Sequence, residues 1–384
     1  MKGATGRVFR IALAATAMVG LALTSASVPA SASSSSGATW RTISQGYDNP
    51  RDIVVGADGR LFVAEAGKGG PKCVGGDEGN ICPGMTGGIS VASKTGPGHH
   101  RIVSGLASLS DTGGVAATGP DGMSRNADGS IFTVITSCPQ QVRGLPAGAF
   151  PSSLVDSVAS QAGQVLKVEG PDRVSEKGGV GGFDWTWSQG HTHLVPGQFP
   201  DCDPYGILTE GQTHWVVDAA SNTLDRVLPN GNVSVQAFIP NPRVSDSVPT
   251  CLDRGPDGAL YIGELTGGGN GPGASVVWRV VPGQKPTVWA SGLTAVTGCG
   301  FVNGQFYASE FSTLGFESFQ PFTGAVVRVA PHSTKPVVVA KGLSFTNGFA
   351  SEGNSIWVSN WSVSPAHPPA GSGLQPGSIV RIDL

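Results

Sequence analysis

Short apolar strands, each preceded by an Asp-Gly or Asn-Gly turn, recur along the chain. In DGRLFVAEAG at 58–67 the apolar strand ends on the carboxylate of Glu65. DGALYIGELTG at 257–267 and NGQFYASEFST at 303–313 repeat the same order of turn, apolar strand and terminal carboxylate. Asp-Gly and Asn-Gly adopt the positive φ angles that two-residue β-hairpins require. The pattern therefore predicts a series of β-hairpins.

A hairpin of this kind occurs six times, and its first strand opens with Pro-x-Gly or a similar sequence. The six hairpins are Pro50 to Glu65, Pro120 to Ile135, Pro204 to Asp218, Pro249 to Glu264, Gly298 to Glu310 and Thr346 to Asn360. A third strand follows each hairpin, at 88–91, 165–168, 224–227, 277–280, 327–329 and 380–382. Five of these six third strands place Lys or Arg between apolar residues, as is typical of a strand with one solvent-facing side. Fourth strands are predicted at 233–238, 287–290 and 337–340.

Six four-stranded units predict an all-β fold, a six-bladed β-propeller. The sequence stops at Leu384, just after a third strand, so we expect the strand at 40–46 to supply the fourth strand of the last blade. Such a closure pairs a sheet edge that would otherwise be open. We therefore predict one domain over 39–384. Two β-sandwich domains are the alternative, but they leave the sixfold repetition unexplained.

The first 32 residues have the features of a secretory signal peptide. A basic head precedes an apolar run at 11–23, and Ala-Ser-Ala at 30–32 is a small-residue cleavage motif. Residues 33–38 are then a flexible Ser-rich lead. We expect the protein to be secreted.

The composition is rich in glycine and poor in charge. There are 58 Gly, and charged residues make up 13% of the chain. Both features suit short strands and tight turns, because glycine weakens helix interiors. The net charge is −3, and removal of the basic leader makes the remainder more acidic. An acidic surface argues against nucleic acid or an anionic membrane as a partner, and no later apolar run is long enough to span a bilayer.

The six cysteines suggest disulfides, because the chain is expected to be exported. Cys73 and Cys82 lie in one Gly-rich loop, which favours their pairing. Cys251 and Cys299 lie near equivalent repeat positions and would link neighbouring blades, which leaves Cys138 and Cys202; other connectivities stay open for these four. A zinc site is the alternative, but no Cys-x-x-Cys pair is present.

Several stretches resemble a known family. They are NPRDIVVGADGRLFVAEAGKGGPKCVGGDEGNICPGMTGG at 49–88, DPYGI at 203–207, VPTCLDRGPDGALYIGELTGGGNGPGASVVWRV at 248–280 and GSIVRIDL at 377–384. The chain resembles ScyD/ScyE family proteins, within the larger class of six-bladed TolB-like and NHL-type propellers. Residues 171–202 and the four cysteines beyond residue 100 depart from the family pattern. The resemblance implies an exported propeller and carries no established activity.

Two rings of residues are expected to face each other at one mouth of the axial channel. In a propeller the second strand ends on the face where the first strand begins. The second-strand ends hold, in blade order, Glu65, Ile135, Asp218, Glu264, Glu310 and Asn360. The strand-opening positions hold Arg51, Asp121, Tyr205, Thr250, Cys299 and Asn347. We expect these polar residues to form an axial ligand-binding ring.

Three roles are open for the carboxylates of this ring. They could accept backbone N–H groups and so terminate the strands, which is a structural role. They could also bind a ligand, or a cation of which Ca²⁺ is the best candidate for an all-oxygen site. The set Glu65, Asp218, Glu264 and Asn360 resembles by position the metal site of gluconolactonase-type propellers. Asp121 is the one candidate for a general base in a hydrolase.

Long loops at 67–87, 136–162, 311–323 and 361–376 are expected on the same face. They carry aromatic residues, namely Phe150, Phe311, Phe316, Phe319, Phe322 and Trp361. We therefore predict a propeller that binds a small molecule or a protein partner at this axial face. The alternatives are a Ca²⁺-dependent hydrolase in the same cup and a purely structural propeller whose aromatics pack as a lid.

Overall fold

The computed structural model describes residues 38–76, 79–240 and 246–384. The predicted leader at 1–32, and the Ser-rich lead up to residue 37, lie outside these residues. Within the described part of the chain, no helix is both long and apolar enough to cross a membrane.

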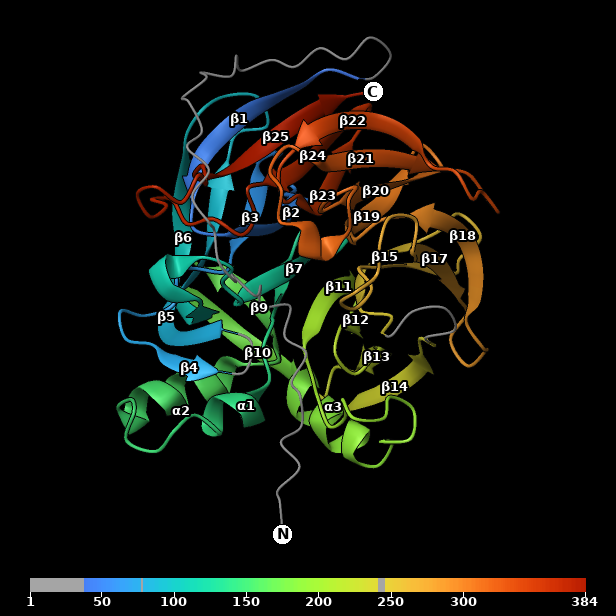
Figure 1. The fold of residues 1–384 in the computed structure, drawn as a ribbon. Coiled ribbons are helices and arrows are strands. Elements are labelled where there is room, and N and C mark those ends of the chain that lie inside the picture. Colours follow the sequence, from blue (N-terminus) through green and yellow to red (C-terminus); the bar gives the residue numbers. More distant parts are fainter. Residues whose placement is uncertain (1–37, 77–78, 241–245) are drawn as a thin grey trace.

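Six antiparallel sheets are arranged around a central axis (Figure 1). Blade 1 contains β2 (Pro50–Val55), β3 (Leu61–Glu65), β5 (Gly79–Ala92) and β6 (His99–Ser110), with the short β4 (Val74–Gly76) paired to β5. Blade 2 contains β7 (Pro120–Arg125), β8 (Ile131–Ile135), β9 (Gln164–Gly170) and β10 (Arg173–Gly179). Blade 3 contains β11 (Pro204–Glu210), β12 (Thr213–Asp218), β13 (Thr223–Val227) and β14 (Val233–Phe238).

The second half of the chain continues the same order. Blade 4 contains β15 (Pro249–Arg254), β16 (Leu260–Glu264), β17 (Ser275–Val280) and β18 (Thr287–Leu293). Blade 5 contains β19 (Val296–Val302), β20 (Gln305–Glu310), β21 (Gly324–Val329) and β22 (Val337–Leu343). Blade 6 contains β23 (Asn347–Glu352), β24 (Ser355–Asn360), β25 (Gly377–Asp383) and β1 (Trp40–Tyr47). The six-bladed all-β propeller is confirmed.

The N-terminal strand closes the last blade as predicted. Strand β1 pairs antiparallel with β25, and Trp40 lies opposite Ile382. The indole N–H of Trp40 also donates to the Lys341 carbonyl of blade 5 at 3.0 Å. The closure therefore fastens the N-terminal segment to both of the last two blades.

Apolar side chains fill the spaces between neighbouring blades. Between blades 4 and 5, for example, Tyr261 meets Trp289 edge-on with ring centroids 5.0 Å apart, and Trp289 meets Phe306 at 5.6 Å. Such pairs add to the stabilisation that comes from burying the rings.

All three predicted disulfides are present. They are Cys73–Cys82, Cys138–Cys202 and Cys251–Cys299. The third disulfide joins β15 to β19, the first strands of blades 4 and 5, and so ties together two neighbouring walls of the channel.

Two features differ from the sequence analysis. Helices α1 (Pro139–Arg143), α2 (Ser152–Gln161) and α3 (Val180–Gln189) occur where no helix was predicted. Helix α2 contacts β5 and β6 of blade 1, and α3 contacts β9 of blade 2 and β12 of blade 3. In blade 5 the first strand begins at Val296, which pairs with Glu310, rather than at Gly298. The residue that opens this strand in register with the other blades is therefore Thr297, not Cys299.

Candidate functional site

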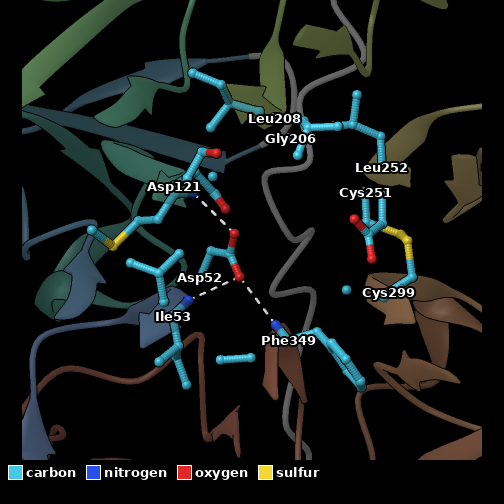
Figure 2. A pocket seen from close by; sticks show the side chains of 18 of the residues that line it. Asp52, Ile53, Asp121, Gly206, Leu208, Cys251, Leu252, Cys299 and Phe349 are labelled. Atoms are coloured by element: carbon cyan, nitrogen blue, oxygen red, sulfur yellow. Dashed lines mark hydrogen bonds between the residues drawn. A yellow bond between two sulfur atoms is a disulfide. The ribbon is translucent and has the colours of Figure 1, made fainter. Parts of the chain in front are cut away.

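The six first strands line a cavity along the axis. Strands β2, β7, β11, β15, β19 and β23 contact one another in a closed circle. They enclose a cavity of about 310 Å³ (Figure 2). Residues at the strand starts, such as Asp121 and Tyr205, are buried, whereas Leu208 and Ser351 near the strand ends are partly exposed and Arg125 is exposed. The cavity is therefore closed where the first strands begin and opens where they end, on the face of the hairpin turns.

Polar side chains close the inner end of the channel. The amide Nδ2 of Asn347 in blade 6 donates to the Tyr205 hydroxyl of blade 3, diametrically opposite, at 2.6 Å. The Thr250 and Thr297 hydroxyls each donate to a carbonyl of the next blade at 2.7 Å. The Asn347–Tyr205 bond spans the axis, and the two threonine bonds link neighbouring blades around it.

An apolar lid lies over this closed end. We call lid the cluster that includes Phe311, Phe345 and Trp361, which also contacts Tyr205. Phe319 stacks on Phe345 with centroids 5.3 Å apart, and Trp361 meets Phe345 edge-on at 5.5 Å. The loops that we expected to surround an open polar cup instead pack together and close this face. Phe150 lies outside the lid, beneath the Lys72 ammonium group.

In blades 1, 3, 4, 5 and 6 the polar residue at the end of the second strand has a structural role. Each side chain accepts a hydrogen bond from the segment that leads into the first strand of its own blade. The pairs are Glu65 with Asp48 N–H at 2.8 Å, Asp218 with Asp203 N–H at 2.8 Å, Glu264 with the Ser247 hydroxyl at 2.8 Å, Glu310 with Thr294 N–H at 2.8 Å, and Asn360 with Ser344 N–H at 2.7 Å. The carboxylate or amide at the strand end therefore holds in place the segment that precedes the first strand of its blade.

Further donors engage the same carboxylates. Glu65 also accepts from the Ser90 hydroxyl and from Arg101, whose Nη2 lies 2.6 Å away. Glu264 accepts from Val276 N–H at 3.0 Å and from the Trp278 indole at 2.8 Å. Burial raises the pKa of Glu264 to about 7, against the lowering effect of these donors.

The residues proposed as calcium ligands do not fit a shared ion. Glu65, Asp218, Glu264 and Asn360 stand at corresponding positions of four blades, and each bonds to donors of its own blade. Within the described residues, no three His, Cys, Asp or Glu side chains are grouped so that they could hold a metal ion. None of the four lines the described axial cavity. The geometry gives no support to a calcium site built from this set.

Asp121 lies at the closed end of the cavity. Among the predicted site residues, its side chain makes the fewest hydrogen bonds. Its carboxylate is 1% exposed, and neither oxygen has a hydrogen-bond partner among the described residues. The Arg51 Nε lies 3.6 Å from one oxygen and also has no hydrogen-bond partner there. The Thr136 hydroxyl is close enough to lower the pKa of Asp121, but it donates to the Pro204 carbonyl at 3.0 Å. The structure thus brings Arg51, Asp121, Tyr205 and Asn347 together as the sequence predicted.

Burial and neighbouring charges set the protonation of Asp121. Burial raises its pKa to about 7, although the Arg51 guanidinium lowers it. The nearby carboxylate of Asp52 raises it further. A carboxyl group with a pKa near neutrality can exchange a proton at physiological pH.

Asp52 is a site residue that the sequence analysis missed. It accepts N–H groups from its own blade at Ile53 (2.8 Å), from blade 2 at Met123 (2.9 Å) and from blade 6 at Phe349 (3.0 Å) (Figure 2). Burial raises its pKa to about 6. Its position one residue after Arg51 could have indicated a channel residue, but the acceptor role depends on contacts between blades that the sequence does not display.

A second group of carboxylates lies between blade 3 and helix α3. Asp184 of α3, Asp218 of β12 and Asp225 of β13 are each fully buried. Neither oxygen of Asp184 accepts a hydrogen bond from a described residue. Burial, then the charges of Asp225 and Asp218, raise the pKa of Asp184 well above its usual range. Burial and these charges therefore favour the neutral carboxylic acid form of Asp184 over the carboxylate.

Comparisons with known proteins support the fold alone. No family model matches the chain and no curated protein matches it, so the resemblance to ScyD/ScyE proteins stays an expectation. A candidate oxidoreductase (glucose dehydrogenase) of Thermus thermophilus is 13% identical, with a TM-score of 0.51 over 90% of this chain and 100% of that one. A protein of unknown function from Bacteroides thetaiotaomicron is 7% identical, with a TM-score of 0.50 over 89% of this chain and 70% of that one. A gluconolactonase of Xanthomonas campestris is 9% identical, with a TM-score of 0.49 over 90% of each chain.

Replacing Glu65 by Ala is expected to destabilise the fold. The change removes the acceptor of Asp48 N–H and Ser90 and leaves Arg101 without its partner, so we expect a loss of about 2 kcal/mol or more in the free energy of unfolding. Urea unfolding of the purified chain measures it, with Glu317→Ala at an exposed position as the matched control. A loss no larger than that of the control would contradict the structural role.

The Asp184→Asn variant is expected to be more stable than the wild type at alkaline pH. Because the folded pKa of Asp184 is raised, the folded state binds its proton more tightly than the unfolded state. Wild-type stability therefore falls as pH rises from about 4 through the folded pKa, and an amide removes this loss. Urea unfolding at pH 5 and pH 8 tests the prediction, with exposed Asp156→Asn as the control. A stability difference between Asp184→Asn and the wild type that does not increase from pH 5 to pH 8 would refute the prediction.

Proposed function

We propose that this protein is an exported six-bladed propeller that binds a small organic molecule in its central channel, entered from the hairpin face. The observation that carries this proposal is Asp121 at the closed end of the cavity, where it is buried with no hydrogen-bond donor on either oxygen among the described residues. Even beside a cation such as Arg51, a buried carboxylate that accepts no hydrogen bond is costly, because the ion pair repays the desolvation of its charges only when hydrogen bonds satisfy the remaining lone pairs. A ligand that supplies the missing donor would offset this cost.

The walls of the channel suit a compact ligand. Met123, Leu208, Leu252 and Phe349 provide apolar surface along the axis. Polar residues lie at the closed end, and Arg125 and Asp253 lie near the open end. A cavity of about 310 Å³ lies at the small end of the roughly 300–1,000 Å³ range of ligand sites. Ligand pockets commonly combine such apolar walls with a few convergent polar groups.

Export is part of the same proposal. The leader predicted at 1–32 and the three disulfides both favour an oxidising compartment outside the cytoplasm. A partner protein on the loop face is less well supported, because most lid aromatics are buried and, among the described residues, only Leu314 and Phe322 present large exposed apolar side chains there.

A hydrolase is the second candidate. The pKa of Asp121, raised to about 7, suits a general acid or base next to a bound substrate. The metal-dependent form of this candidate has less support, because the proposed ligands do not meet. A purely structural propeller explains the strand-end carboxylates but gives no reason for a buried Asp121 that accepts no hydrogen bond from the described residues.

Blocking the channel should abolish binding. We expect members of a mixed set of small cyclic and aromatic compounds to bind the wild type in ligand-observed NMR, and Leu208→Trp to weaken this binding about tenfold or more by filling the channel. Val337→Trp, at an exposed position on the outer edge of blade 5, is the matched control. Absence of any binding, or binding that Leu208→Trp leaves unchanged, would refute the proposed site.

A further inference from the structure

Arg51 and Asp121 form an ion pair at the closed end of the channel, and this ion pair contains no hydrogen bond. The Nε of Arg51 lacks a hydrogen-bond acceptor among the described residues, and both oxygens of Asp121, the nearer one 3.6 Å from that nitrogen, lack a donor. Arg51 is held in place because its Nη2 donates to the Ala117 carbonyl. A ligand group that both donates and accepts would complete this pair.

From this arrangement we propose that the ligand is an uncharged alcohol, whose hydroxyl donates to Asp121 and accepts from Arg51, and whose body is a compact apolar ring. The inference rests on the proposed function, since it names the chemical class of the molecule in the channel. A hydroxyl group has one donor proton and two acceptor lone pairs, so one atom can serve both residues.

The charges around the head group disfavour an ionic ligand. An ammonium group would donate to Asp121 but would meet the guanidinium of Arg51 and would have to be desolvated at a site where Asp121 is 1% exposed. A carboxylate would accept from Arg51 but would meet Asp121 and Asp52, which lie close together. The neutral hydroxyl avoids both repulsions.

The side chains that line the channel suit a ligand whose ring is apolar. Phe349 and Leu208 line the channel from opposite blades and are partly buried, and Leu252 and Met123 lie between them around the circle. These side chains offer apolar contact along the axis but no further charge until Asp253 and Arg125 near the open end. A flat or saturated ring with one short hydroxymethyl arm fits this arrangement, because its hydroxyl reaches the polar closed end while its ring contacts the apolar side chains.

Three probes of nearly equal shape test the class. Benzyl alcohol, benzylamine and toluene share one ring and differ in the head group. We expect benzyl alcohol to bind about tenfold more tightly than either of the others, as measured by NMR titration at pH 7. Asp121→Asn should reduce the preference for the alcohol over toluene, because the amide brings its own donors to the ligand. Asp156→Asn, at an exposed position outside the channel, should leave that preference unchanged.

The outcomes separate this inference from the proposed function. Tightest binding of benzylamine, or equal binding of toluene and the alcohol, would overturn the alcohol class while leaving the channel as a ligand site, provided that Leu208→Trp still abolishes binding. Failure of all three probes to bind at millimolar concentration would count against the alcohol class. If the mixed compound set also fails to bind, the proposed function is refuted with it.

Discussion

The axial architecture depends on satisfying the backbone polar groups of six inner strands that belong to six different sheets. Each first strand is the innermost edge of its own sheet, so the groups along that edge face the channel and have no neighbouring strand to pair with. Side chains take the place of a neighbouring strand. Asp52 accepts N–H groups from three blades, and Asp253 accepts Phe301 N–H from the next blade at 2.8 Å. Most polar residues near the axis are therefore engaged in holding the ring of blades together.

The same constraint explains why a ring of carboxylates need not be a binding site. Glu65, Glu264 and Glu310 stand where a metal-binding cup could form, but each fixes the segment that enters its blade. In blade 2 the apolar Ile135 replaces the carboxylate, which shows that the position can be filled without charge. Against this background Asp121 is distinctive, because it is buried at the axis and accepts no hydrogen bond from the described residues.

Much of the fold could be predicted from the sequence, because its determinants are local. Asp-Gly turns, alternating strands and the N-terminal closing strand each follow from short-range pattern. A shared loop indicated Cys73–Cys82, repeat positions indicated Cys251–Cys299, and Cys138–Cys202 was the pair that remained. The sequence did not predict which face of the channel is open. Loops lie on both faces, and only side-chain packing determines which face they close. Phe345 and Trp361 come from separate loops of blade 6 and meet only in three dimensions. The register of blade 5 was misassigned because Gly298 was taken as the start of its first strand, whereas Val296 holds the position that proline holds in blades 1 to 4.

The adjacency of Arg51 and Asp121 and the separation of the four residues proposed as calcium ligands have one cause. The position of a residue in the repeat predicts its height along the propeller axis and its distance from that axis. It does not predict which neighbouring residue forms a hydrogen bond with it. Asp121 and Arg51 were correctly placed together because they hold equivalent positions in adjacent blades. The donors that engage Glu264, in contrast, include Trp278 from the third strand, whose orientation depends on the packing of the whole blade.

The central claim is that the channel opens only on the hairpin face, and thiol accessibility tests it most directly. All six cysteines are in disulfides, so one introduced thiol can be followed alone. Ser351→Cys lies at the open end of the channel, and Ala219→Cys lies in the lid cluster, where Ala219 is 2% exposed. The account predicts that iodoacetamide labels Ser351→Cys in the native protein and labels Ala219→Cys only after unfolding. Labelling of Ala219→Cys in the native protein at the rate of Ser351→Cys would show that the loop face is open and would contradict it.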